Sequence, residues 1–283
     1  MNKSFNLTQN PTDLLKELVR NRFLDVSVGR DANLLMGRLV ETAFEYFARP
    51  TEEKLLNSTS DGNIGFRQFA REYSQVRERP DLNECFTYWA SRPDYIPNAK
   101  KIEPLLDVLT EYTNSVSDVA ERVLGGLQKS LGGKNAVNFR GSSYIQMNYY
   151  PEMVSSQHSG REYLQDIHED GHLMTLVFAT SAGLEAVIDD KSVMLEGEPG
   201  GVIVMPGSLM TAMTGGLVEP LFHRVKRNNG QRRLSVMYFV NPNTAFAVEP
   251  CVSNYTNSSV DIRKLAVTNP RMFGLPDALS FND

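Results

Sequence analysis

Residues 172–188 read HLMTLVFATSAGLEAVI, two short runs of β-forming residues joined by small turn-forming ones. The same texture continues on both sides of this stretch from about residue 140, with Gly, Pro, Asn and Asp between the runs. Many short strands at even spacing are typical of a sandwich or barrel. We therefore predict a mainly β core, whose seven strand-like runs are residues 142–150, 172–180, 182–188, 191–197, 201–206, 221–227 and 232–240.

The first 130 or so residues have a different, helical pattern. Residues 31–47 carry apolar side chains at helical spacing, with Asp31 as the expected N-cap and Pro50 as the stop. Thr51 is expected to cap a short helix in TEEKLL. From Pro104 one apolar stripe continues for about six turns until Gly132 and Gly133, which predicts one long helix with a buried face.

Residues 57–100 mix Gly, Pro and aromatic residues without a clean period, so we expect loops and short strands there. No stretch is rich enough in Pro, Gly or Ser to separate two domains. We therefore predict a helical N-terminal region, residues 1–139, that packs on a β core, residues 140–283, as one cooperative unit.

The composition bounds the class of protein. The chain has 283 residues, 41% of them hydrophobic and 22% charged, with a net charge of −5. These values are typical of a globular protein and argue against bulk nucleic-acid binding. No apolar run approaches the roughly 20 residues that span a bilayer, and the N-terminus lacks a secretory apolar stretch, so we expect a cytoplasmic protein with no membrane partner. Cys85 and Cys251 are expected to be free thiols.

A metal site is indicated by His168, Asp170 and His223. His168 and Asp170 are two positions apart, and in a strand such residues share a face. His223 lies in a later β-type run, which a closed sheet could bring opposite the pair. Two imidazoles and one carboxylate on one side of an ion suit non-haem Fe(II). By itself the triad is only moderately specific, because a lone His is more often a core residue.

The run around His223 predicts a hairpin with the run that follows. A three-residue loop, Asn228-Asn229-Gly230, would place His223 opposite Ser235 and Val225 opposite Arg233. An Arg that points into an apolar core needs an anion. Arg233, with a hydroxyl from Ser235, therefore suits the distal carboxylate of a small diacid that also touches the metal. The alternative is a salt bridge to a protein carboxylate.

An ordered series of motifs resembles the iron(II)- and 2-oxoglutarate-dependent oxygenases of the isopenicillin-N-synthase-like branch. The N-terminal stretches FEYFARPTEEKL, GFRQFAREY and PDLNECFTYW are similar to the helical region of that family. MNYYP, HEDGHLMTLVF, GLEAVI, GVIVMPG and HRVKRNNGQRRLSVMYFVNPN are similar to its core strands. One departure is that the N-terminus lacks the opening Pro-x-Ile-Asp-like strand of many members.

The resemblance implies a fold, cofactors and site residues. The fold is a double-stranded β-helix, or jelly roll, with a helical N-terminal region. Fe(II) would be held by His168, Asp170 and His223, with O2 as the oxidant. The cosubstrate 2-oxoglutarate would be held by Arg233, Ser235, Tyr150 and Asn148. Halogenating members lack a carboxylate at the position of Asp170, so its presence implies hydroxylation, desaturation or ring formation, with succinate and CO2 as co-products.

The substrate residues are less well defined. In relatives the barrel mouth is flanked by the region that here holds Phe66, Arg67, Phe86, Tyr88 and Arg92, although aromatic residues there also join helix to barrel. His172 is expected in the wall of the site rather than as a metal ligand.

Two other functions stay open at this point. One is a 2-oxoglutarate-independent non-haem iron oxidase of the same fold, in which the Arg-X-Ser pair holds the substrate's own carboxylate. The other is a non-catalytic jelly-roll binding protein. We expect a small-molecule substrate, specialised metabolism by family habit, and a monomer.

Overall fold

The computed structural model describes residues 11–28, 30–133, 136–152, 160–227 and 231–243. Among these residues no helix is long and apolar enough to cross a bilayer. The helices are α1 (Pro11–Asn21), α2 (Arg30–Phe47), α3 (Thr51–Leu55), α4 (Glu103–Leu131) and α5 (Ser208–Met213), with 3-10 turns at Pro93–Tyr95 and Ala99–Ile102.

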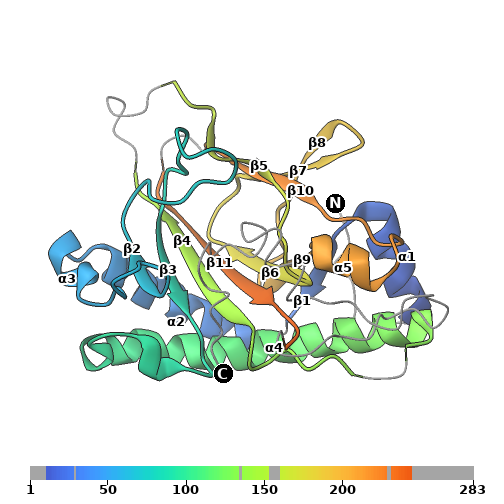
Figure 1. Ribbon diagram of the computed structural model, residues 1–283, viewed down its shortest axis with the longest axis horizontal. Helices are drawn as coiled ribbons and strands as arrows, with labels where there is room; N and C mark the ends of the chain where they lie inside the picture. Colours follow the sequence, from blue (N-terminus) through green and yellow to red (C-terminus); the bar gives the residue numbers. More distant parts are fainter. Residues whose placement is uncertain (1–10, 29, 134–135, 153–159, 228–230, 244–283) are drawn as a thin grey trace.

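Two antiparallel sheets form the β core (Figure 1). The large sheet has the order β1 (Leu24–Ser27), β9 (Gly201–Pro206), β6 (Met174–Ala179), β11 (Arg233–Val240), β4 (Tyr144–Tyr150), β3 (Glu84–Tyr88) and β2 (Gly65–Arg67). The small sheet has the order β5 (Tyr163–His168), β10 (Phe222–Lys226), β7 (Leu184–Ile188) and β8 (Lys191–Met194). The protein is therefore mainly β with flanking helices, as the sequence predicts.

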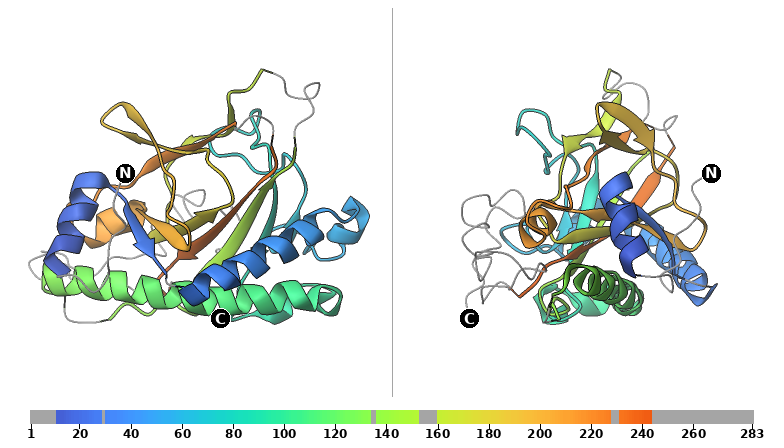
Figure 2. Two further views of the ribbon diagram at one scale, coloured as in Figure 1. Left: turned by 180° about the vertical axis from the view of Figure 1, so that it is seen from behind. Right: turned by 90° about the vertical axis from the view of Figure 1, so that its right-hand side faces the viewer.

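The long helix α4 covers the outer face of the large sheet (Figures 1 and 2). Its predicted apolar stripe, including Leu109, Val116 and Val123, is fully buried, and Gly132 ends the helix in the left-handed conformation at φ 75°. Each such aliphatic side chain contributes roughly 1.5–3 kcal/mol when fully buried. α2 packs beside α4, so the helices and the large sheet share one apolar core.

The alternation of strand side chains separates this helix-side core from the interior between the sheets. On β11, Leu234, Val236, Tyr238 and Val240 join the helix-side core, whereas Met237 and Phe239 join a second cluster with Leu184 and Ala186 of β7. That second cluster draws residues from both sheets, so their inner faces pack together. Arg233 and Ser235 have the same strand parity as Met237 and therefore point inward.

Three strands come from before residue 139: β2 and β3 are short strands of the kind expected in residues 57–100, whereas β1 lies where helices were expected. β1 pairs with β9 at one edge of the large sheet, and β2 and β3 extend the other edge beyond β4. The N-terminus lacks the Pro-x-Ile-Asp-like motif, but residues 24–27, LDVS, form a strand after α1. Two expected caps are wrong, since α2 begins at Arg30, before Asp31, and α3 begins at Thr51 after Pro50.

The predicted hairpin between the runs of His223 and Arg233 does not form. β10 pairs with β5 and β7 in the small sheet, whereas β11 pairs with β4 and β6 in the large sheet. The chain changes sheets between them, and the expected loop residues 228–230 lie outside the described part. Ser235 instead lies opposite Asn148, and Arg233 opposite Tyr150. The prediction failed because it took two consecutive strands to be paired neighbours, whereas β10 and β11 lie in different sheets.

Candidate metal centre and active site

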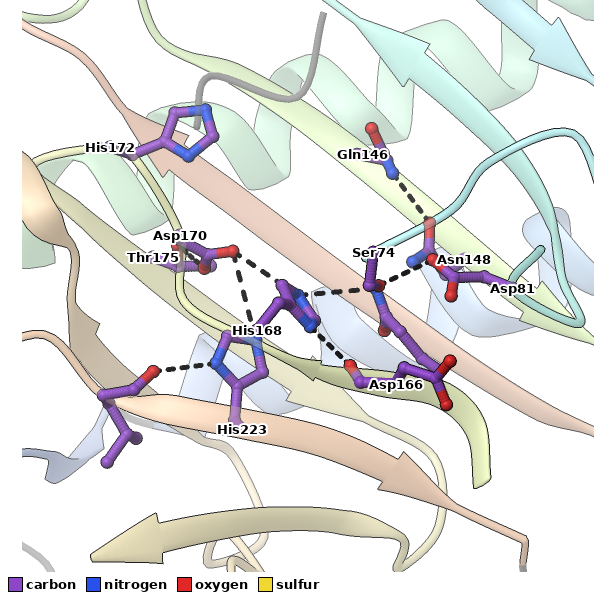
Figure 3. A network of polar contacts seen from close by, with 12 residues as sticks. Ser74, Asp81, Gln146, Asn148, Asp166, His168, Asp170, His172, Thr175 and His223 are labelled. Carbon is purple, nitrogen blue, oxygen red and sulfur yellow. Dashed lines mark hydrogen bonds and ion pairs between the residues drawn. The ribbon is translucent and has the colours of Figure 1, made fainter. Parts of the chain in front are cut away.

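His168, Asp170 and His223 come together in the interior between the sheets, and their ligand atoms all lie within 4.8 Å of one another. Asp170 Oδ1 is 3.8 Å from His168 Nε2 and 4.0 Å from His223 Nε2 (Figure 3). These separations are too long for hydrogen bonds. Three converging donor atoms with space between them are what a bound cation requires.

The two histidines are brought together by direct pairing of β5 and β10, in which His223 is the partner of His168. The next pair is Val225 with Gln165, so three residues of β5 span two of β10. This bulge turns both Gln165 and His168 to the inside, although they are three positions apart.

Asp170 is positioned by a turn and not by strand parity, because β5 ends at His168. The turn is held by the Ser208 N–H, which donates to the Asp170 carbonyl at 2.9 Å. Gly207 packs so closely under this turn that a Cβ there would lie 2.2 Å from the His172 carbonyl oxygen. Our strand-parity explanation for His168 and Asp170 is therefore wrong, although the two side chains do converge. Nothing in the local sequence signals the role of Gly207.

Backbone carbonyls fix the orientation of both imidazoles. His168 Nδ1 lies 2.8 Å from the Asp166 carbonyl oxygen, and His223 Nδ1 lies 3.0 Å from that of Leu221 (Figure 3). A carbonyl only accepts, so each Nδ1 carries the proton and each Nε2 presents its lone pair toward Asp170. Thr175 donates its hydroxyl to Asp170 Oδ2 at 2.5 Å, which holds the carboxylate in place.

The electrostatics keep two of the three donors, His223 and Asp170, in the forms that bind a metal. Burial, with the charge of His168, lowers the pKa of His223 to about 4, despite Asp170. The pKa of Asp170 lies below its ordinary value, because the imidazoles of His223 and His168 and the Thr175 hydrogen bond outweigh the effect of burial. At neutral pH the site therefore offers a neutral His223 and an ionised Asp170, and metal binding displaces no proton from them.

Arg233 is buried to 1% exposure and has no carboxylate partner among the described residues. Its guanidinium donates to the Ser235 hydroxyl and to the Ser181 carbonyl, the latter at 3.2 Å, and lies 5.5 Å from the centre of the Tyr150 ring. Burial holds its pKa below the ordinary value. A buried cation with only dipoles around it is costly unless an anion binds. The alternative of a protein salt bridge finds no support in these contacts.

Tyr150, Asn148 and Ser235 surround Arg233, as the strand pairing requires. Between this group and the three donors lies Gln165, which sequence reasoning missed. Its Oε1 accepts the Tyr150 hydroxyl at 3.1 Å, and its Nε2 is 3.5 Å from His168 Nε2. The β-bulge that turns Gln165 inward leaves no readable mark in the sequence.

A cavity of about 1040 Å³ opens onto His168 and Asp170. Of the six predicted substrate residues, Phe66, Arg67 and His172 are among its lining residues. The ring of Phe66 nevertheless lies in the helix-side core against Tyr46. His172 forms part of the wall, as expected: its Nε2 is 3.0 Å from the Tyr144 hydroxyl and its ring stacks on Phe239 at 4.3 Å.

The other three predicted substrate residues do not line the cavity. Phe86 and Tyr88 point toward the helices, because alternation on β3 turns them away from the interior, and Tyr88 meets Thr110 of α4 at 2.9 Å. Arg92 is half-exposed, lies beside Asp94 and stacks over Tyr95. For these three the prediction is corrected: the first two join sheet to helix, and Arg92 lies at the surface.

Residues 141–242, which contain all three donors and Arg233, match the model of the 2OG-Fe(II) oxygenase superfamily. This part of the chain therefore carries the domain of that superfamily. Its cofactors are therefore Fe(II), 2-oxoglutarate and O2, and it is an oxidoreductase of the dioxygenase type. The His-Asp-His geometry and the unpaired Arg233 fit these cofactors.

Similar proteins include plant dioxygenases at low identity. The chain is 24% identical to flavanone 3-dioxygenase 2 of Oryza sativa subsp. japonica, over 84% of its own length and 70% of that protein. It is 26% identical to gibberellin 3-beta-dioxygenase 2 of Arabidopsis thaliana, over 82% of the chain and 66% of that protein. The chain thus matches about two thirds of the length of these curated relatives.

Solved structures support the jelly-roll fold. A full-length Neurospora crassa protein, solved in complex with alpha-KG, superposes with a TM-score of 0.76 at 18% identity, covering 91% of this chain and 90% of that one. A 2OG-Fe(II) oxygenase family protein from Caulobacter crescentus gives 0.77 at 18% identity, covering 95% and 98%. The prediction of a jelly-roll core is confirmed.

Proposed function

We propose that this oxygenase oxidises an unactivated C–H bond of a small molecule by hydroxylation, desaturation or ring formation, in specialised metabolism. The observation that carries the proposal is the set of three converging donors beside an uncompensated, buried Arg233. The relatives named for flavanone, gibberellin and hyoscyamine oxidation support the assignment to small-molecule chemistry.

In this proposal His168, Asp170 and His223 hold Fe(II) on one side and leave its other positions for ligands. The Asp166 and Leu221 carbonyls keep each imidazole in the correct tautomer. Asp170 supplies one negative charge, so that the site neutralises only part of the charge of the cation and still attracts an anionic cosubstrate.

Arg233, Ser235 and Tyr150 would hold the distal carboxylate of 2-oxoglutarate, with Asn148 beside them. The guanidinium provides the charge, and the Ser235 and Tyr150 hydroxyls provide further donors. To reach that carboxylate, the Tyr150 hydroxyl turns away from Gln165, to which it donates in the free protein. Fe(II), 2-oxoglutarate and O2 would together supply the oxidising power for the C–H oxidation, and 2-oxoglutarate would be converted to succinate and CO2.

The metal assignment is tested by Asp170→Ala, with Glu169→Ala as the matched control one residue away. We expect Asp170→Ala to weaken anaerobic Fe(II) binding by at least about 100-fold, because it removes a charged ligand and not merely a supporting contact. Equilibrium dialysis of Fe(II) measures this, and Glu169→Ala should bind like the wild type. Wild-type protein that binds no Fe(II), or an unchanged Asp170→Ala variant, would favour the non-catalytic binding protein.

The same preparation separates the dioxygenase from the oxidase. A metabolite screen with Fe(II) and ascorbate, run with and without 2-oxoglutarate, should give substrate-dependent succinate in step with O2 use. Turnover that continues when 2-oxoglutarate is omitted would support the oxidase and exclude the dioxygenase.

A further inference from the structure

The wall of the cavity carries many polar groups beside its apolar surface. All its lining residues except Leu55, Gly62, Phe66 and Phe239 carry a polar side-chain atom. A hydrocarbon-like ligand would strip water from these groups without replacing its hydrogen bonds, at a large cost. The ligand that fits such a wall offers hydrogen bonds of its own.

Two charged groups of this wall, Arg67 and Glu72, form a nearly buried ion pair, with side chains that are 14% and 15% exposed. Arg67 follows Phe66 at the end of β2, and its partner in the sheet is Cys85 of β3. Alternation therefore points Arg67 inward while Phe66 packs against the helices. The exposure that remains to the pair faces the cavity that both residues line.

Glu72 is held firmly in place. Gln146 of β4 donates to both of its oxygens, at 3.3 Å and 3.1 Å, and Arg67 donates to Oε1. The Cys85 thiol, whose pKa burial raises well above its ordinary value, also hydrogen-bonds to Glu72. The Glu72 carboxylate is thus fixed against the inner face of the large sheet, at strands β2, β3 and β4.

The pair nevertheless keeps spare hydrogen-bonding capacity. Arg67 uses Nε on the Gly62 carbonyl, Nη1 on Glu72 and Nη2 on the Asn63 carbonyl, which leaves two of its five N–H groups unassigned. Oε2 of Glu72 accepts from Gln146 at 3.1 Å and not from Arg67, and the Cys85 thiol is only a weak donor, so Oε2 can accept a further N–H. A donor and an acceptor therefore stand side by side on the wall.

Arg67 and Glu72 line the same cavity as His168 and Asp170, and Tyr144 is part of the same wall. Burial raises the pKa of Tyr144, and the charges of Asp170 and Glu72 raise it further whereas Arg67 lowers it, which agrees with this arrangement. A molecule held by this pair would lie in the same cavity as His168 and Asp170.

We propose that Arg67 and Glu72 recognise the substrate by hydrogen bonds. The substrate would carry a hydrogen-bond acceptor next to a hydrogen-bond donor, as at the edge of an amide, lactam or ureide. Its acceptor receives an N–H of Arg67 and its donor binds Glu72 Oε2. This inference rests on the proposed function only in treating the cavity as the substrate site.

The test compares two probes of nearly the same ring: thymine, which has such edges, and 1,3-dimethylthymine, which keeps the acceptors but has no N–H. Binding to the full chain with Fe(II) and 2-oxoglutarate is measured anaerobically by equilibrium dialysis. We expect thymine to bind at least about 10-fold more tightly, the effect of one hydrogen bond to a charged group. Equal affinities, or no binding of either probe, overturn the proposal without any variant.

Glu72→Gln, with Arg71→Met as control at an exposed residue that also lines the cavity, assigns the preference to the pair. Glu72→Gln removes the charge of the acceptor and leaves the Arg67 donor, so it should reduce the preference for thymine to about twofold or less and leave dimethylthymine binding within about twofold, whereas Arg71→Met should keep the preference. Loss of both probes alike in Glu72→Gln would mean a structural role and would overturn the proposal. Binding of 2-oxoglutarate is measured in the same samples. If 2-oxoglutarate does not bind but thymine is still preferred, the proposed function is contradicted and this inference is not.

Discussion

Arg233 illustrates how a single side chain can be stable only as part of a binding site. It is among the largest fully buried side chains of the described residues, yet its contacts are a hydroxyl, a carbonyl and an aromatic ring. Arg224, nine positions earlier, shows the ordinary solution: a fork of two hydrogen bonds to Glu185 at 3.1 Å and 3.2 Å. The difference between the two arginines indicates that Arg233 lacks an anionic partner among the described residues and suits a bound anion.

Arg233→Met should therefore separate binding from stability. We expect 2-oxoglutarate binding to fall by at least about 100-fold, since a buried charged partner is lost, while the melting temperature in the absence of ligand does not fall. Anaerobic titration of the Fe(II) protein with 2-oxoglutarate, together with thermal melts, checks both expectations. Arg224→Met, which breaks the pair with Glu185 on the outer face, should leave 2-oxoglutarate binding unchanged. A destabilised Arg233→Met variant that still binds 2-oxoglutarate would contradict the assignment.

At the scale of elements, the metal donors depend on two irregular features, the bulge in β5 and the turn from His168 to Asp170. Both sit where a regular element ends or is interrupted. Periodicity predicts regular elements such as α4 well, because its stripe repeats over many turns. It cannot predict a bulge, which depends on the partner strand. The sequence therefore predicted that Asp170 and His223 converge with His168, but for partly wrong geometric reasons.

Gly207→Ala tests the turn, because its new Cβ would lie 2.2 Å from the His172 carbonyl oxygen and 2.6 Å from that of Asp170. These are backbone atoms, so the turn itself must shift. We expect Fe(II) affinity to fall by about 10-fold or more, as for other losses of support around a metal ligand. Gly37→Ala is the matched control: no atom lies within 4 Å of its Cβ in α2, and the change should stabilise the protein by about 0.5–1 kcal/mol. If Gly207→Ala bound Fe(II) normally, the turn would not position Asp170.

At the scale of the whole molecule, the residues before and after position 139 build one large sheet together. The domain boundary that we proposed at residue 139 divides the large sheet, since β1, β2 and β3 lie before it and β4, β6, β9 and β11 after it. The sequence predicts these later strands and the helices, but it cannot show which strands are neighbours. Resemblance to a family supplied that arrangement where local patterns, as with His223 and Arg233, failed.

The pH dependence of global stability has a clear contributor in Asp81, which is 2% exposed and accepts a hydrogen bond from Ser74 at 2.8 Å. Burial raises its pKa from 3.8 to about 6, despite the Ser74 hydrogen bond. The folded state therefore binds the proton more tightly than the unfolded state. As pH rises from about 4 to about 6, Asp81 lowers the free energy of unfolding by about 3 kcal/mol, and above pH 6 its effect is constant.

Asp81→Asn should remove this contribution while keeping an acceptor for Ser74. The variant should be more stable than the wild type at pH 7, by up to about 3 kcal/mol, with the difference shrinking to near zero at pH 4. Urea unfolding of both proteins across this range measures the difference directly, and other titrating groups cancel. A difference that stays constant with pH, or has the opposite sign, would show that the Asp81 carboxylate is well solvated.

The change of sheets between β10 and β11 also determines the distance between the metal donors and Arg233. His223 belongs to the small sheet and Arg233 to the large one. The distance between a bound cation and the guanidinium therefore depends on the separation of the two sheets. The spacers are the apolar side chains packed between the sheets, such as Leu184, Ala186 and Met237. These apolar core residues would then determine which chain length of diacid can reach both the cation and Arg233. Enlarging or trimming them would change which dicarboxylate spans the gap, without touching a single binding residue.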